Sequence, residues 1–405
     1  MSHQALIRPV RDWLIEQALG NPDIVSLYQN LCERLVAIGL PITRGRLIWQ
    51  TLHPLFRAET VVWDRNEQAR LEHFEHQDNA TDAWLNSPLR HVMVNDIGTL
   101  RRRLTGPNET LDFPILVELK EKGVTDYLVI ASRIEHAIVT GDPNLMGPRG
   151  IIVTWACTRP EGFSQDDLEA LQQIQKIFAL ACKTVIQSAI SANIATTYLG
   201  SRAAANVLRG QIRRGDGATT RAVVWFSDLR NSTAYAESMT SEDYFSLLNA
   251  YFEATAGPLV EHGGEVLDFI GDAVLGIFPF EDERELAEAA GRAHGALDEV
   301  LRRSREANAE RAAAGLERFR FGVGLNAGDV KFGNIGIPQR LSFSVIGHTV
   351  NEVARIESMT KLLQQPVLSA SGLASLDAKR WRSVGRHKLD GVLDPVELFS
   401  YHQAA

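Results

Sequence analysis

The sequence predicts an α+β protein with two domains. The chain has 405 residues, which at about 100–200 residues per domain is too long for one. Its first half has the order helix, strands, long helix, whereas from Arg221 onward strands alternate with helices. With 45% hydrophobic and 23% charged residues the composition is that of an ordinary globular protein, which excludes wholesale disorder.

The first half begins with helical spacing. Apolar residues recur every three or four positions and predict one or two helices over residues 8–39, stopped by Gly39 and Pro41. Residues 65–125 are mostly polar and poorly periodic. Four apolar runs around them predict strands, namely Arg46–His53, Ala58–Asp64, Asp126–Ser132 and Gly150–Cys157.

A long helix closes this half. Ser164 with Asp167 three residues later forms a capping box, and the apolar face that follows predicts a helix of about two dozen residues. The order of elements resembles a GAF-like domain, so residues 1–190 are expected to form a regulatory domain. A small-molecule or protein regulator would act there, and neither its identity nor its direction follows from the sequence.

The sequence of residues 191–218 predicts a helical connector that ends in a turn-rich segment. Arg209, Arg213 and Arg214 form a small basic cluster in it. A solvated connector accounts for this cluster, and a contact to phosphate or to a partner is the alternative.

The second half alternates strands and helices. Thr240 with Asp243 three residues later caps a helix that ends at Gly263-Gly264. Further helices are expected at 282–313 and 347–363. Apolar runs predict strands at Ala222–Phe226, on both sides of a turn at Gly271-Asp272, at Phe319–Asn326 and Asp329–Asn334 with a hinge at Ala327-Gly328, and near Trp381–Leu389 and Val396–Tyr401.

Two carboxylates follow strands in this half. Asp228 comes after the run VVWFS, and Asp272 lies in the turn of FIGDAV. Carboxylates at strand ends suit divalent cations that bridge to phosphates. Aspartate is also common in turns for conformational reasons, so the spacing alone leaves both interpretations open.

Four motifs occur in order along residues 219–401: FSDLRNST, GGEVLDFIGDAVLGIF, VGLNAGDVKFGNIG and FSVIGHTVNEVARIE. Together they resemble the catalytic domain of class III nucleotide cyclases. The resemblance implies a ferredoxin-like, βαββαβ-type domain over residues 219–405. It also implies a homodimeric enzyme that converts a purine nucleoside triphosphate, ATP or GTP, to the cyclic monophosphate and pyrophosphate.

The resemblance also assigns roles to the residues around the first two motifs. Asp228 and Asp272, with the main chain at Leu229, match the metal-binding positions for two Mg²⁺ or Mn²⁺ ions per site. The backbone that follows would hold the triphosphate, at Arg230, Asn231, Ser232 and Thr233.

Asn351 and Arg355 lie one helical turn apart in TVNEVARIE, so both can project from the same helix face. They match the residue pair that the family uses in the transition state. Asparagine would orient the ribose, and the planar guanidinium would stabilise charge that builds up on the α-phosphate. Without the resemblance, a solvated helix face would account for both.

The base-selecting positions depart from the usual adenylate cyclase pattern. Asp268 stands where lysine is common, and Ser344 where Asp or Thr is common. An acidic acceptor favours the N–H donors of guanine, whereas serine can pair with either purine. Because adenylate cyclases are the commoner bacterial-type members of the family, ATP is expected ahead of GTP, and the choice stays open. A domain that binds nucleotide without turnover is the remaining alternative.

The net charge of −8 gives no reason to expect a nucleic-acid partner. Three scattered cysteines, Cys32, Cys157 and Cys182, suggest neither a disulfide framework nor a metal pair, and a reducing cytoplasm fits them best. No secretory leader or membrane span is recognisable in the sequence, so membrane insertion is not expected.

Overall fold

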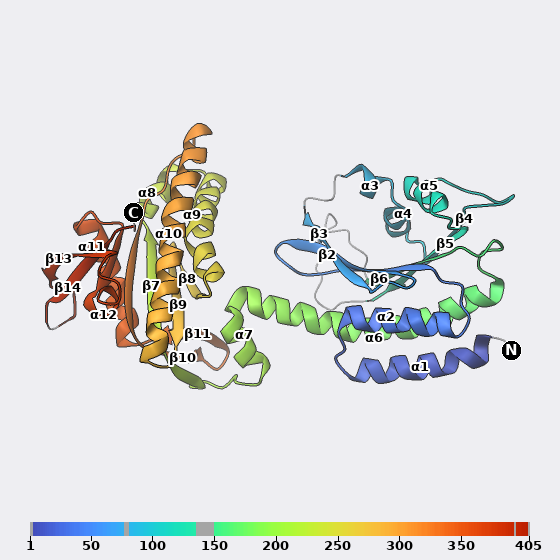
Figure 1. Ribbon diagram of the computed structural model, residues 1–405, viewed down its shortest axis with the longest axis horizontal. Helices are drawn as coiled ribbons and strands as arrows, with labels where there is room; N and C mark the ends of the chain where they lie inside the picture. Colours follow the sequence, from blue (N-terminus) through green and yellow to red (C-terminus); the bar gives the residue numbers. More distant parts are fainter. Residues whose placement is uncertain (1–2, 77–80, 135–149, 393, 404–405) are drawn as a thin grey trace. The chain divides into compact units, whose positions relative to one another are not determined.

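The structure is a computed structural model, and it describes residues 3–76, 81–134, 150–392 and 394–403. The chain divides into two compact units, Met1–Ile194 and Ala195–Ala405 (Figure 1). Each unit is built around its own β-sheet with helices on both faces. Both units are therefore of mixed α and β structure, as the sequence predicts.

The sheet of the N-terminal unit has six strands, and every neighbouring pair is antiparallel, in the order β3-β2-β1-β6-β5-β4. The strands are β1 (Arg44–Gln50), β2 (Phe56–Asp64), β3 (Arg70–Glu75), β4 (Thr99–Arg103), β5 (Asp126–Arg133) and β6 (Gly150–Cys157). Polar residues 65–125 thus contain two strands and three helices that their weak periodicity does not predict.

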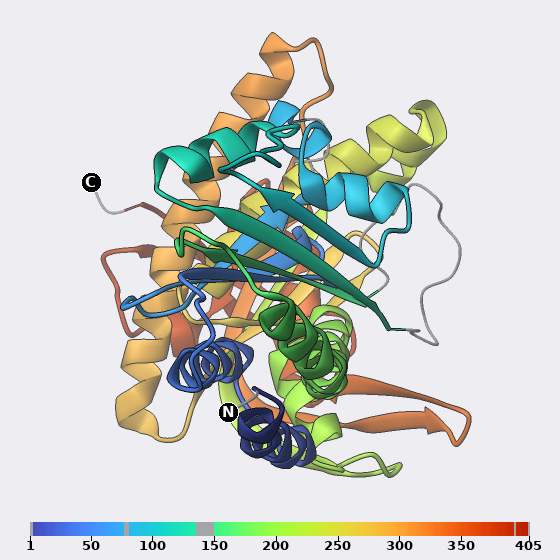
Figure 2. The same ribbon diagram turned by 90° about the vertical axis from the view of Figure 1, so that its right-hand side faces the viewer.

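Two layers of helices enclose this sheet. The first layer is α1 (His3–Leu19), α2 (Ile24–Ala37) and α6 (Gln165–Leu199), and the second is α3 (Asp82–Leu85), α4 (Pro88–Val94) and α5 (Pro114–Glu121). Figures 1 and 2 show the layers on opposite faces of the sheet. Side chains alternate between the faces of a strand, so Leu47 and Trp49 of β1 enter the core beneath the first layer.

The long helix α6 begins as predicted. Ser164 Oγ accepts from the Asp167 N–H at 3.2 Å, and the Asp167 carboxylate accepts from the Ser164 N–H at 2.7 Å. By length and composition alone, α6 is the one helix in the described ranges that could cross a membrane, with a mean hydropathy of 1.4. Its buried residues, from Asp167 to Ile186, lie in the part of the helix that packs in the core of the unit.

The sheet of the C-terminal unit has the strand order β13-β14-β12-β10-β7-β9-β8, and β11 pairs with β10. Its strands are β7 (Gly217–Leu229), β8 (Glu265–Ile270), β9 (Ala273–Phe280), β10 (Phe321–Ile337), β11 (Arg340–Ile346), β12 (Val367–Ala370), β13 (Trp381–His387) and β14 (Val396–Tyr401). Strands β10-β7-β9-β8 are mutually antiparallel, which is the arrangement of a ferredoxin-like βαββαβ unit.

The helices of this unit are α7 (Ser201–Leu208), α8 (Ser232–Ser238), α9 (Ser241–Glu261), α10 (Glu283–Ala313), α11 (His348–Leu362) and α12 (Ser371–Ala374). The larger core lies between the sheet and helices α9 and α10, around Trp225, Tyr251 and Phe278. On the other face, Val353 of α11 packs with Val224 and Ile277. The strands that carry the motifs are thus held rigidly from both sides.

The predicted hinge at Ala327-Gly328 is wrong, because β10 runs through it without a break. Gly328 pairs with Ala222 of β7, in register with the rest of the ladder. A Cβ atom built on Gly328 would lie 2.4 Å from Thr349 Oγ1. This glycine therefore allows α11 to approach the strand closely and does not serve a turn.

Candidate active site

Strands β7 and β9 bring the two predicted aspartates together. Asp228 lies at the end of β7, directly opposite Ala273 of β9. Asp272 precedes Ala273 in the turn between β8 and β9, which Gly271 allows by adopting a φ of 66°. Residues that are 44 positions apart in sequence thus lie together at one end of adjacent strands, because the β7–β9 ladder holds the strands in register.

The two carboxyls interact strongly. Burial, followed by the charge of Asp272 and a hydrogen bond between the two side chains, raises the pKa of Asp228 from 3.8 to about 6. The two side chains share one site, so the ionised form of Asp228 is disfavoured relative to a free aspartate, and a cation bound by the pair would relieve this repulsion. This arrangement favours a divalent cation at neutral pH.

The donor set fits Mg²⁺ or Mn²⁺ bound together with substrate. No cluster of three or more His, Cys, Asp or Glu side chains that could hold a metal occurs in the described part of the chain. A pair of carboxylates completed by phosphate oxygens and water is the usual way in which proteins bind Mg²⁺. The side chain of Leu229 is buried in the core, so only its main chain can contribute a ligand.

The predicted phosphate segment follows Asp228 directly. Asn231 adopts a left-handed conformation, with a φ of 65°, and α8 begins at Ser232. Thr233 and Asn231 are exposed. Arg230, in contrast, donates from Nη2 to the Gln365 carbonyl oxygen at 3.0 Å, and burial lowers its pKa. This arginine therefore anchors the segment to the loop that follows α11.

Asn351 and Arg355 are both exposed on α11. Within the described ranges, neither side chain makes a hydrogen bond or ion pair, either with Asp228 and Asp272 or with any other residue. The aspartate pair is thus assembled within one chain, whereas the Asn351–Arg355 pair faces outward with its polar groups free to bind a ligand.

Glu357, on the buried side of α11, is a site residue that sequence analysis missed. It is 8% exposed, and burial together with the charge of Asp228 raises its pKa to about 7. Thr360 Oγ1 donates to its carboxylate at 3.3 Å. An acidic residue four positions after Val353, on the apolar face of the helix, is the signal that could have found it.

The two positions predicted to select the base lie on strands that approach each other without pairing. Asp268 is exposed on the edge strand β8, just after a bulge between Val266 and Asp268. Ser344 lies on β11, where its hydroxyl donates to Ser342 Oγ at 3.3 Å. Strands β8 and β11 approach each other, although no hydrogen bond joins the two side chains within the described residues.

Comparisons with known proteins show which family the C-terminal unit resembles. Residues 217–392 match the family model described as "Adenylate and Guanylate cyclase catalytic domain". "Adenylate cyclase 1" of Rhizobium meliloti is 29% identical over 178 residues, which are 43% of this chain and 26% of that protein. "Adenylate cyclase" of Anabaena cylindrica is 32% identical over 150 residues, 37% of this chain and 29% of that protein.

A solved structure, the adenylyl cyclase CyaB from P. aeruginosa, is 23% identical and covers 47% of this chain and 97% of its own, with a TM-score of 0.41. Residues 217–392 thus form a domain of the adenylate and guanylate cyclase catalytic family. The chain spans less than a third of the length of the two curated relatives.

Proposed function

We propose that the protein is a homodimeric class III adenylate cyclase that converts ATP to 3',5'-cyclic AMP and pyrophosphate. The observation that carries this proposal is the pairing of Asp228 and Asp272 at one end of strands β7 and β9, within the residues that match the cyclase family model. The pKa of Asp228 is raised to about 6 there. Such a site is built to hold divalent cations and the phosphates that accompany them.

In the proposed reaction the 3'-oxygen of the ribose attacks the α-phosphorus, a new P–O bond forms, and the bond to pyrophosphate breaks. Two bound Mg²⁺ or Mn²⁺ ions would lower the pKa of the 3'-hydroxyl and neutralise charge on the phosphates. Asp228 and Asp272 would hold them, with the main chain of Leu229. The exposed main chain from Asn231 to Thr233 would bind the triphosphate.

Asn351 and Arg355 would complete the site from the second subunit. Arg355 would donate to the α-phosphate as negative charge builds up there, and Asn351 would orient the ribose. Their exposure and lack of partners in the described chain support this role, because a polar pair awaiting a ligand is expected to be unpartnered.

The apolar side chains on the β10–β11 hairpin support a dimer. Ile335, Ile337, Leu341 and Ile346 are 36–60% exposed. They project from two paired strands in the same hairpin, and such surfaces commonly mark contacts between proteins. If the hairpin of one chain packs against a second copy of the chain, the two chains form a homodimer. Each chain would then contribute an aspartate pair to one site and an Asn351–Arg355 pair to the other.

GTP is the second candidate substrate, favoured by Asp268. This carboxylate is exposed on β8 and can accept hydrogen bonds from the N–H groups of guanine. ATP is placed first because the two relatives described above are named adenylate cyclases. Domains of this family that have lost activity usually lose an aspartate or the Asn/Arg pair, and all four residues are present here.

We further infer that the N-terminal unit is a GAF-like regulatory domain and that the protein acts in the cytosol. Its six-stranded antiparallel sheet between two helical layers supports the first inference. The second is supported by Cys32, Cys157 and Cys182, which are all buried as free thiols.

Mixing two inactive variants tests the shared site. Asp228→Ala and Arg355→Ala should each lose cyclase activity alone. After co-expression, heterodimers should regain activity at one of their two sites, because that site combines an intact aspartate pair with an intact arginine. Mixing Asp228→Ala with Asp272→Ala is the matched control and should restore nothing. Failure of the first mixture to recover would contradict a site built from two subunits.

A further inference from the structure

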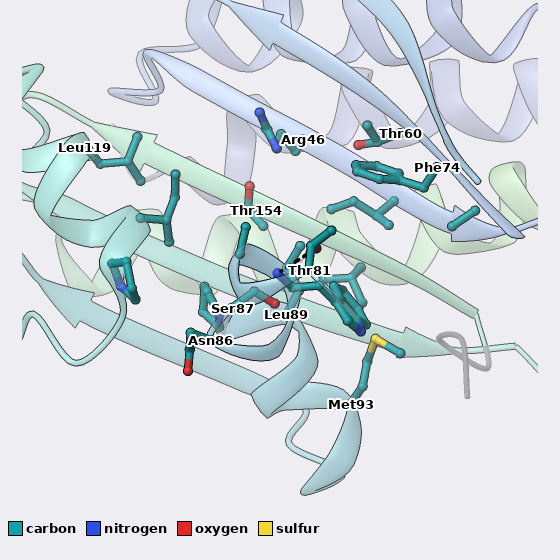
Figure 3. A pocket seen from close by; sticks show the side chains of 18 of the residues that line it. Arg46, Thr60, Phe74, Thr81, Asn86, Ser87, Leu89, Met93, Leu119 and Thr154 are labelled. Atoms are coloured by element: carbon teal, nitrogen blue, oxygen red, sulfur yellow. Dashed lines mark hydrogen bonds between the residues drawn. The ribbon is translucent and has the colours of Figure 1, made fainter. Parts of the chain in front are cut away.

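The N-terminal unit encloses a cavity of about 680 Å³ between the sheet and helices α3 to α5. Its floor is the face of β1, β2 and β6 opposite the main core, where Arg46, Thr60 and Thr154 project (Figure 3). Residues of α3 and α4, including Leu89 and Met93, form the opposite wall. The volume falls within the range of about 300–1,000 Å³ that is typical of ligand pockets.

Arg46 is the polar group on the floor that lacks a partner. It lies in register between Val62 of β2 and Thr154 of β6, in the middle of the sheet. Its guanidinium makes no hydrogen bond or ion pair with any residue of the described chain. Burial, together with the positive charge of Arg44, lowers its pKa, which means that the folded unit disfavours this charge.

Two carboxylates on nearby strands, Asp64 of β2 and Glu72 of β3, are already engaged by other arginines. Asp64 forms ion pairs with Arg44 at 3.3 Å and with Arg70 at 3.5 Å. Glu72 pairs with Arg70 at 3.2 Å. A partly buried guanidinium in the middle of a sheet is costly unless a counter-charge reaches it. Within the described residues the charge of Glu72 offsets part of this cost, but no carboxylate forms an ion pair with Arg46.

The cavity lining has an excess of positive charge and an extensive apolar surface. Its permanently charged side chains are Arg44, Arg46, Arg57 and Lys122, against a single carboxylate, Glu118. The Arg57 guanidinium lies 4.7 Å from the centre of the Trp84 ring. A concave wall with an excess of positive charge concentrates anions, while the apolar side chains favour an organic group.

We propose that this cavity binds a small organic anion, with its acidic group paired to Arg46 and its apolar, planar part against the wall formed by α3 and α4. Carboxylate, sulfonate and phosphate esters share the chemistry that a guanidinium recognises. The site belongs to the N-terminal unit, and its occupancy can be measured without nucleotide, so the proposal does not depend on the cyclase activity.

Two fluorescent probes with the same aromatic skeleton test this proposal. Anilinonaphthalene sulfonate carries an acidic group, and N-phenylnaphthylamine does not. Their affinities would be measured by fluorescence titration of the full-length wild-type protein, of Arg46→Met and of Arg8→Met. Methionine keeps most of the volume of arginine without its charge. Arg8 is the matched control, since its side chain is 84% exposed on α1, away from the cavity.

In Arg46→Met the affinity for the sulfonate should fall by about tenfold or more while that for the neutral probe is retained, as expected for the loss of a charge-assisted hydrogen bond. Arg8→Met should bind both probes like the wild type. An unchanged ratio of the two affinities in Arg46→Met would overturn the proposal, whether both affinities stay the same or both fall equally.

A second variant locates the site if Arg46→Met does not fold. Ala58→Phe adds a ring to the cavity wall on β2 and should weaken both probes. Its folding would be checked by circular dichroism and by the melting temperature. Undiminished binding of both probes to folded Ala58→Phe would show that they bind elsewhere and would refute the assignment of this cavity.

Discussion

Replacing Asp272 by asparagine should stabilise the metal-free protein and abolish its response to metal. The raised pKa of Asp228, about 6 against the usual 3.8, corresponds to about 3 kcal/mol if taken in full. Burial is the largest cause of this rise, and Asp228 is only half-buried, so screening by solvent reduces the contribution of Asp272. About 1 kcal/mol remains for the repulsion that Asp272→Asn removes.

For a unit of this size, 1 kcal/mol corresponds to a change of about 2–4 °C in melting temperature. The melting temperature would be measured at about pH 8, above the raised pKa of Asp228, once with EDTA and once with Mn²⁺. Wild type should melt lower in EDTA and be raised by Mn²⁺, whereas Asp272→Asn should melt about 2–4 °C higher in EDTA and no longer respond to the metal. Asp268→Asn, on the same edge of the sheet, is the control and should respond like the wild type.

A lower melting temperature of Asp272→Asn in EDTA would refute the repulsion between the two carboxylates. A full response of this variant to Mn²⁺ would refute their joint role as metal ligands. The two readouts are independent, so each part of the reasoning can fail separately.

Three further predictions concern stability and substrate choice. The pKa of Glu357 is raised from about 4.5 to about 7, so this residue contributes stability at low pH that is lost as the pH rises through about 7. Glutamine does not titrate, so the unfolding free energy of Glu357→Gln relative to wild type should increase by about 3 kcal/mol between about pH 4.5 and pH 8. Urea unfolding in EDTA would measure this difference, and no change with pH would contradict the raised pKa. Asp126→Ala should cost about 3 kcal/mol in unfolding free energy, because it leaves Arg101, 2.6 Å from the buried Asp126 carboxylate, without its partner; a loss below about 0.5 kcal/mol would show that the pair is not structural. Asp268→Ala should change the ratio of kcat/KM for ATP and GTP if this side chain reads the base, and an unchanged ratio would assign base choice to other groups.

Local signals predict much of the C-terminal fold. The Thr240–Asp243 cap is present, with the Asp243 N–H donating to Thr240 Oγ1 at 3.2 Å, and the turn at Gly271-Asp272 lies where the sequence places it. These features depend on residues within four positions of one another, so they can be recognised without knowledge of the fold.

The stretch from 65 to 125 could not be predicted in the same way. Strand β3 is an edge strand with mostly exposed side chains, and α3 is only four residues long. Neither has enough buried positions to produce a clear periodicity. Furthermore, several side chains of this stretch line the cavity rather than the core, which weakens the contrast between the two faces of each element.

Gly328 and Glu357 show a second limit of sequence reasoning. The pair Ala327-Gly328 predicts a hinge from its local sequence, although the role of Gly328 depends on Thr349, which is 21 positions away and packs against it. Similarly, the proximity of Glu357 to Asp228 arises only when α11 packs across the sheet. Interactions between distant segments determine both, and no local pattern reports them.

Identification of the product tests the proposed function most directly. Purified full-length protein would be incubated with Mn²⁺ and, in separate reactions, with ATP, GTP, CTP or UTP, and the products identified by mass spectrometry. Cyclic AMP from ATP, absent when EDTA replaces the metal and in Asp228→Ala, is the predicted result. Cyclic GMP alone would show that Asp268 selects guanine, and the absence of a cyclic product from all four substrates would contradict the proposal that this domain is a cyclase.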